Sequence, residues 1–210
     1  MAKIDNNALF FANFIDADLK LADLLDYLND VSKFIDRKRK HKEKTYKESI
    51  LKDTAIKMFT ESFTSTLFES TLISAWVFME AEFKGYCNAM QKAMGIDLSY
   101  SDLKGSAIER FRVYTSKVLS LDFRLKDENW EDLQAINEIR NSIVHSEGNV
   151  RNKRLVTSFL KRNKLSGLLS NGKMSFDKNS LSIIITICRL LIQRIYSVAL
   201  HKFPGEYGPK

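Results

Sequence analysis

The sequence predicts an all-α fold, a helical bundle, and two observations support this fold class. Proline occurs twice and glycine eight times in 210 residues. Both residues disrupt helix interiors, whereas all-β proteins use them freely at turns. Apolar residues recur three and four positions apart over long stretches, which places them on one face of a helix. The hydrophobic share of 44% is that of a chain able to form a core, and the length suits one compact domain.

Two long helices are predicted in the N-terminal half. The first runs from Ala8 to Lys44 and ends in the basic run 37–42, which we expect to be a solvated helix end rather than a binding site. Its apolar face consists of Phe14, Leu21, Leu24, Leu25, Leu28, Val31 and Ile35. The second runs from Tyr46 to Met94, with a bend or break in the hydroxyl-rich segment 60–66. Its apolar stripe consists of Leu72, Trp76, Met79, Phe83, Cys87 and Met90.

Two shorter helices follow in the sequence. We expect the third over residues 101–119, with Ser101 as its N-cap, because serine side chains accept hydrogen bonds from the first free backbone N–H groups of a helix. The fourth is predicted over residues 130–147. Either Asp127 or Asn129 can cap it, since both residue types favour that position.

The last quarter of the chain is predicted to contain one hairpin and one helix. Residues 168–176 indicate a short β-hairpin, because Asn171-Gly172 is a preferred type I′ turn. The final helix is expected over residues 179–202. We find neither an internal repeat nor a clear linker. The simplest organisation has three parts: an N-terminal helical extension at 1–60, a helical domain at 61–203 and a flexible tail at 204–210.

The formal net charge of +7 favours polyanionic partners, either nucleic acid or an anionic membrane surface. The opening residues lack the features of a signal peptide, and the most apolar segment, 181–200, carries Arg189 and Arg194, so we expect no membrane span. Cys87 and Cys188 are isolated on apolar stripes and are expected to be buried free thiols, as in a cytoplasmic protein. Three histidines without paired spacing argue against a metal site, and no cofactor is expected.

The fourth predicted helix carries an arginine on its apolar face. That face consists of Leu133, Ile136, Ile139, Ile143 and Val144. Arg140 lies within it and must either extend to solvent or meet an acidic partner, because an unpaired buried charge is very unfavourable. Glu80, within the apolar stripe of the second helix, is the candidate partner. Such a pair would hold the guanidinium in place for catalysis, although a purely structural ion pair explains the same pattern equally well.

His145 follows Arg140 on the same helix but lies about 140° further around it. One straight helix therefore does not easily aim both side chains at one phosphate. Two copies of the helix related by a two-fold axis would bring the histidine of each copy to the arginine of the other. A helix end that frays near Gly148 is the alternative way to bring them together.

Arg140-Asn141-x-x-x-His145 resembles the R-(polar)-x-x-x-H signature of the HEPN superfamily, the small helical bundles of many prokaryotic toxins, abortive-infection proteins and CRISPR ribonucleases. The helix that carries Phe78-Met79-Glu80 is also similar, and the resemblance covers roughly residues 66–202. It implies a HEPN-like bundle that forms a homodimer, in which two motifs make one RNA-cleaving centre without a metal ion.

Residue chemistry assigns the same roles. Histidine exchanges protons near neutral pH, so His145 can act as general acid or base at the ribose 2′-OH or the leaving oxygen. The fork of Arg140 suits a phosphate, Asn141 can hold a phosphate oxygen or orient a side chain, and Glu80 would position the arginine. Cleavage through the 2′-OH restricts the activity to RNA and leaves a cyclic phosphate. Six basic residues are candidates for guiding the RNA backbone, although solvation explains them equally well: Arg151, Lys153, Arg154, Lys161, Arg162 and Lys164.

The biological setting indicated by the resemblance is a toxin–antitoxin system, abortive infection or antiviral defence. Some HEPN toxins carry a tyrosine two residues after the histidine, which an antitoxin modifies; Glu147 stands there in this chain, so another antitoxin or defence partner is expected. Two other readings stay open. One is a non-catalytic HEPN-fold module that binds RNA, nucleotides or a protein. The other is a helical interaction protein in which Arg140 and His145 are structural.

Overall fold

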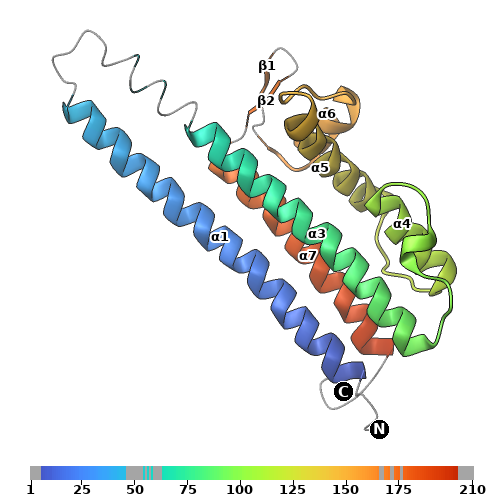
Figure 1. The fold of residues 1–210 in the computed structure, drawn as a ribbon. Helices are drawn as coiled ribbons and strands as arrows, with labels where there is room; N and C mark the ends of the chain where they lie inside the picture. The colour runs from blue at the N-terminus through green and yellow to red at the C-terminus, as the bar shows by residue number, and fades with distance from the viewer. Residues whose placement is uncertain are drawn as a thin grey trace. The chain divides into compact units, whose positions relative to one another are not determined.

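The computed structural model describes residues 6–45, 54, 56, 58, 63–165, 168–170, 173–175 and 177–202, and most of them are helical (Figure 1). The predicted all-α class is therefore confirmed for this part of the chain. The helices are α1 Asn6–Thr45, α3 Thr64–Met94, α4 Ala107–Val113, α5 Asp127–His145, α6 Lys153–Arg162 and α7 Lys178–Lys202. A short 3-10 helix, η2 (Tyr100–Asp102), precedes α4, and a π-helical turn, η3 (Tyr114–Val118), follows it.

The chain forms two compact units that do not follow the order of the sequence. Unit 1 comprises Met1–Ala22, Trp76–Gln134 and Thr186–Lys210, and unit 2 comprises Asp23–Ala75 and Ala135–Ile185. The helices α1, α3, α5 and α7 contribute residues to both units. The predicted boundary after residue 60 falls between α1 and α3, where the structure describes only isolated positions. The N-terminal extension and the flexible tail therefore stay predictions.

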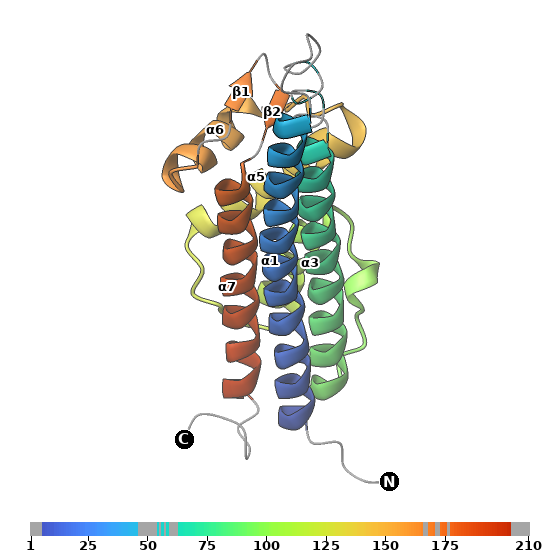
Figure 2. The same ribbon diagram turned by 90° about the vertical axis from the view of Figure 1, so that its left-hand side faces the viewer.

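Aromatic side chains fill the core of unit 1. The ring of Phe111 stacks on Phe83 with centroids 4.4 Å apart and on Phe123 with centroids 5.7 Å apart. Tyr86 meets Phe111 edge-on at 6.1 Å, and the Phe111 and Trp130 centroids are 6.3 Å apart. Within this unit the parts of α1, α3 and α7 lie side by side (Figures 1 and 2), and the Tyr196 hydroxyl of α7 donates a 2.9 Å hydrogen bond to Glu82 of α3. All six predicted stripe residues of α3 are buried, which confirms its core-facing side.

An ion pair joins α1 to α7 in unit 1. Arg189 donates from Nε and Nη2 to the two carboxylate oxygens of Asp18, both at 2.6 Å, and Gln193 donates to the same carboxylate at 2.8 Å. The hydrogen bond from Arg189 is the main reason that the pKa of Asp18 lies below its ordinary value of 3.8. A carboxyl group whose pKa is lower in the folded than in the unfolded state stabilises the fold at any pH at which it is ionised in both states. This contribution disappears as the pH falls through the folded-state pKa.

We therefore expect Asp18→Asn to lower the free energy of unfolding by about 1–2 kcal/mol at pH 7, since hydrogen bonds to a charged group are lost. As the pH falls below 3.8 and through the lowered folded-state pKa, the wild-type carboxyl is itself protonated, so the difference between the two proteins should shrink. Urea unfolding at pH 7 and at a series of pH values below 3.8 measures it. Asp30→Asn, which removes an exposed carboxylate of α1, is the control and should change stability by less than about 0.5 kcal/mol. A pH-independent loss at Asp18 would contradict the ion-pair explanation.

The third predicted helix is wrong in its start and its length. The helix α4 begins after Ser106, whose hydroxyl accepts from the Glu109 N–H while Glu109 bonds back to the Ser106 N–H. Ser101 lies instead inside η2, which Ser99 caps. Gly105 explains the separation: its φ of +112° is a conformation that other residues rarely adopt, and it breaks the chain direction before α4.

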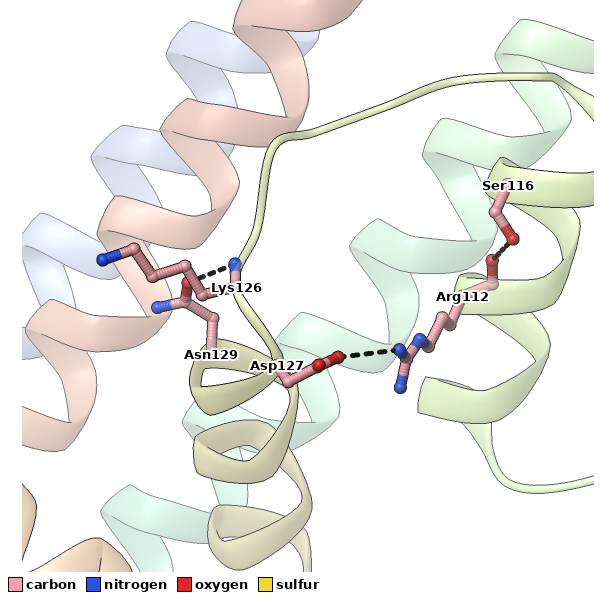
Figure 3. Close-up of polar contacts among 5 residues, drawn as sticks. All are labelled: Arg112, Ser116, Lys126, Asp127 and Asn129. Atoms are coloured by element: carbon pink, nitrogen blue, oxygen red, sulfur yellow. Dashed lines mark hydrogen bonds and ion pairs between the residues drawn. The ribbon is translucent and has the colours of Figure 1, made fainter.

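Two side-chain contacts fix the first turn of α5 (Figure 3). Arg112 donates from Nη2 to Asp127 Oδ1 at 3.1 Å, and this pair connects α4 to α5 within unit 1. Asn129 reaches back and accepts a 3.0 Å hydrogen bond from the backbone N–H of Lys126. Asn129 therefore lies inside the helix and does not act as its N-cap, which was one of the two predicted alternatives. Asp127 is the first residue of the helix.

Unit 2 contains the C-terminal part of α5, the amphipathic α6 and a short hairpin. Val156, Phe159 and Leu160 of α6 are buried, and the strands β1 (Leu168–Ser170) and β2 (Lys173–Ser175) pair antiparallel with Leu169 opposite Met174. The predicted hairpin spans these strands, and its predicted turn, Asn171-Gly172, lies outside the described residues.

The last helix, α7, is a weak candidate for a membrane span, so the expectation of no span stays a prediction. It is long and apolar enough to cross a membrane by length and composition, despite Arg189 and Arg194, although core helices of soluble proteins meet the same criteria. Just under half of its most apolar window, 44%, is buried within the protein. Cys188 of α7 and Cys87 of α3 are buried free thiols, as predicted, and burial raises the pKa of Cys188 to about 12.

Candidate functional site

The C-terminal end of α5 is closed by a tight turn. Gly148 has a φ of +82°, and its N–H donates to the Ser142 carbonyl at 2.8 Å, which also accepts from the Ser146 N–H at 3.0 Å. Glu138, two turns earlier on α5, then accepts the backbone N–H groups of Arg151 at 2.7 Å and Asn152 at 3.0 Å. This carboxylate ties the segment after the turn to α5 and brings Arg151 next to the helix.

A cavity of about 220 Å³ lies at this helix end, entirely within unit 2. Its lining consists of Glu138, Asn141, Ser142, His145, Ser146 and Arg151. Asn141 and His145 are four residues apart, one helical turn, so both side chains project from the same side of α5. The imidazole and the Arg151 side chain are exposed, whereas Ser142 is buried and its hydroxyl donates to the Ile139 carbonyl at 2.7 Å. An imidazole, an amide and a guanidinium thus surround one solvent-accessible cavity.

Arg140 is half-buried next to this cavity but does not line it. Its Nη1 donates a 2.8 Å hydrogen bond to Asn141 Oδ1, so the amide connects the arginine to the cavity wall. Its Nε is buried without a hydrogen-bond partner. The structure therefore brings Asn141 and His145 together in one chain and keeps Arg140 on the adjacent side, as the 140° separation predicts.

The predicted apolar face of α5 is only partly correct. Leu133, Ile136 and Ile139 are buried, and Ile143 is half-buried. Val144 is 44% exposed, so its assignment to the core is wrong. The last turn of α5 extends beyond the core, which exposes an apolar side chain and leaves His145 accessible.

Glu80 lies in unit 1, whereas Arg140 lies in unit 2, so their predicted ion pair stays a prediction. Glu80 is half-buried and accepts a 3.0 Å hydrogen bond from the indole Nε1 of Trp76, one turn earlier on α3. It lines a cavity of unit 1, which is separate from the cavity around His145.

The basic residues of the segment after α5 face away from the core. Arg151, Lys153, Arg154, Lys161 and Lys164 are exposed, and Arg162 is half-buried. Because Val156, Phe159 and Leu160 turn the opposite face of α6 inward, the five exposed residues of this set are accessible to solvent. Asn152 caps α6 by accepting from the Leu155 N–H at 3.1 Å.

Sequence reasoning missed three residues of the cavity: Glu138, Ser142 and Ser146. Glu138 and Ser142 precede His145 by seven and three positions, which is the spacing of one helix face, so the pattern could have indicated them. The contact of Glu138 with the backbone at Arg151 has no such signal in the sequence. In the part of the chain that the structure describes, no three histidine, cysteine or acidic residues form a group that could hold a metal ion.

Comparisons with known proteins add no relative: no protein-family model, no curated protein and no solved structure matches this chain.

Proposed function

We propose that this chain is an endoribonuclease of the HEPN kind, which cleaves RNA without a metal ion as a toxin or phage-defence effector of the cytoplasm. The observation that carries the proposal is the cavity at the end of α5, where His145, Asn141 and Arg151 surround about 220 Å³ of accessible space. These are a proton-transfer group, a hydrogen-bonding amide and a cation, the set that phosphodiester chemistry needs.

The proposed reaction uses the ribose 2′-OH as the nucleophile. A base removes its proton, the O2′–P bond forms, and the P–O5′ bond breaks as an acid protonates the leaving oxygen. The products are a 2′,3′-cyclic phosphate and a 5′-hydroxyl end. One imidazole of His145 can accept the first proton and a second imidazole can donate the other, which two copies of the chain would supply.

Arg140 supports a composite site in a homodimer. Its Nη1 donates a hydrogen bond to Asn141, and its side chain does not line the cavity of its own chain. Its Nε has no hydrogen-bond partner among the described residues. A guanidinium that lies next to the cavity of its own chain but does not line it is suited to bind a phosphate that is held between two copies of the chain. The HEPN-like bundle and the pairing with an antitoxin or defence protein are part of this proposal.

The test is a cleavage assay with purified protein, structured and unstructured RNA, and excess EDTA. We expect cleavage to persist in EDTA, the products to carry cyclic phosphate ends, and DNA of the same sequence to remain intact. Size-exclusion chromatography with light scattering should give a dimer. If no RNA is cleaved by freshly purified dimer, the catalytic proposal fails.

The basic face of α6 yields a separate prediction. The triple variant Lys153→Gln/Arg154→Gln/Lys161→Gln should bind RNA more weakly, and its plot of log affinity against log salt concentration should be shallower by about 2 units. Each lost phosphate contact with single-stranded RNA removes about 0.7 from that slope. Fluorescence anisotropy at several salt concentrations measures both quantities.

The matched control removes three exposed lysines of unit 1, Lys104, Lys117 and Lys126, and so changes the net charge equally. An equal loss of salt dependence in both triple variants would mean that net charge, not α6, attracts the RNA.

A second candidate function is a non-catalytic RNA-binding module of the same fold. It is favoured by the hydrogen bond from Arg140 Nη1 to Asn141, because this bond engages part of the guanidinium within its own chain. Binding of RNA without cleavage in the EDTA assay would select this candidate.

A further inference from the structure

A second cavity, within unit 1, lies between α3 and the segment that joins η2 to α4. Its volume is about 460 Å³, and small-molecule sites usually measure about 300–1,000 Å³. Its charged lining comes from Glu80 and Lys84 of α3 and Arg110 of α4, and the hydroxyl-bearing residues Tyr100, Ser101 and Ser106 also line it. One acidic and two basic side chains therefore face a space of ligand size.

The charged side chains of this cavity do not form ion pairs with one another in the described part of the chain. Among the described residues, Glu80, Lys84 and Arg110 take part in no ion pair. The hydrogen bond that Glu80 accepts comes from Trp76, a neutral donor. Half-buried charges are unfavourable without a partner, so opposite charges that share a cavity and do not pair are available to a ligand.

Arg110 is held in place by an aromatic ring. Its guanidinium carbon lies 4.9 Å from the centroid of Tyr100, a ring only 2% exposed, whose hydroxyl donates to the Ala107 carbonyl at 3.1 Å. The Nε of Arg110 is buried and has no hydrogen-bond partner among the residues that the structure describes. An arginine with a structural role normally donates to a carboxylate or carbonyl, whereas stacking fixes the position of Arg110 and leaves its charge uncompensated.

Tyr100 lies within electrostatic range of the charges of Arg110 and Glu80. Burial raises the pKa of Tyr100; the guanidinium of Arg110 opposes this increase, and the carboxylate of Glu80 adds to it. The two groups therefore act on the same hydroxyl from within electrostatic range, one from α4 and one from α3. The cavity is thus lined by an acidic side chain from α3 and a basic side chain from α4.

We propose that this cavity binds a small zwitterion, with its carboxylate or phosphate against Arg110 and Lys84 and its protonated amine against Glu80. A zwitterion satisfies both unpaired signs at once, which neither a simple anion nor a simple amine does. Because the cavity is lined by two basic side chains and only one acidic side chain, its ligand needs an anionic group. The hydroxyl of Ser101 adds a hydrogen-bonding group to the same lining.

Isothermal titration calorimetry on the full chain tests the proposal. The probes are β-alanine, 4-aminobutyrate and phosphoethanolamine, which differ in charge separation and in the type of anion. Propionate, inorganic phosphate and ethylamine represent the isolated charges. We expect at least one zwitterion to bind ten-fold more tightly than either of its halves, and the comparison of carboxylate with phosphate identifies the anion. The proposal is overturned if the halves bind as tightly as the zwitterions, or if no probe binds at 10 mM.

Variants identify the site. Glu80→Gln should weaken zwitterion binding at least ten-fold, and Lys84→Gln, at an exposed position, should weaken it several-fold without affecting the core. Lys92→Gln removes an exposed lysine of α3 outside this cavity and should change nothing. Circular dichroism checks that each variant folds. Unchanged affinity in Lys84→Gln and a folded Glu80→Gln would overturn the assignment. RNA is absent from this experiment, so its outcome is independent of the proposed ribonuclease activity.

Discussion

Replacing His145 with alanine should lower the rate of RNA cleavage by about 10²- to 10⁴-fold, the usual contribution of a general acid or base. The imidazole lines the cavity and is exposed, so its removal should leave the fold intact. Arg140→Ala should cause a loss of the same order through the phosphate that it would hold, and Arg140→Lys should recover only part of the rate because lysine lacks the planar fork.

The chain offers matched controls for the histidine. His41 and His201 are exposed on α1 and α7, and neither lines the cavity at the end of α5. His41→Ala and His201→Ala should retain the wild-type rate, measured by the initial velocity on a fluorescent RNA in EDTA. Cleavage that survives both His145→Ala and Arg140→Ala would remove the proposed site, whatever the origin of the activity.

Mixing the two inactive variants tests the composite site. If one arginine and one histidine from different copies suffice, a dimer that contains one Arg140→Ala chain and one His145→Ala chain regains part of the activity. No recovery, together with elution of the wild type as a monomer, would argue for a site within one chain.

The largest effect on stability is expected at Phe111. Phe111→Ala should lower the free energy of unfolding by about 3–5 kcal/mol, because it removes a fully buried ring that stacks on Phe83 and Phe123. Urea unfolding followed by tryptophan fluorescence measures the loss, since Trp76 and Trp130 both belong to unit 1. Val113→Ala, at a 45% exposed position of the same helix, is the control and should cost less than about 1 kcal/mol. A similar loss in both variants would mean that α4 helix propensity, not the aromatic cluster, determines stability.

Helical periodicity predicted the core-facing side of α3 fully and that of α1 in part. The six stripe residues of α3 are buried. Of the seven residues predicted for the apolar face of α1, three are buried, Leu21, Leu28 and Ile35, and four are half-buried, Phe14, Leu24, Leu25 and Val31. Such faces are encoded locally, because residues three and four apart meet the same neighbour whatever the rest of the fold. Gly95 and Gly148 follow the ends of α3 and α5, and both have positive φ angles, which glycine adopts more readily than other residues.

The candidate site was predicted less completely. His145 and Asn141 followed from a motif, but the cavity also needs the contact between Glu138 and the backbone at Arg151, thirteen residues away, which no short pattern contains. The exposed Val144 shows the same limit, since the apolar pattern does not tell where the core ends along a helix. Two serines form capping boxes in this region, Ser99 with Asp102 at η2 and Ser106 with Glu109 at α4, so the serine pattern alone does not tell where the longer helix starts.

The division into two units has a consequence for how such a protein can change through evolution. Unit 1 is assembled from three separate stretches of chain and unit 2 from two. No uninterrupted block of a gene encodes either unit, so recombination between genes cannot transfer one of them alone. Diversity in this architecture must arise by substitution within the helices or by insertion between them.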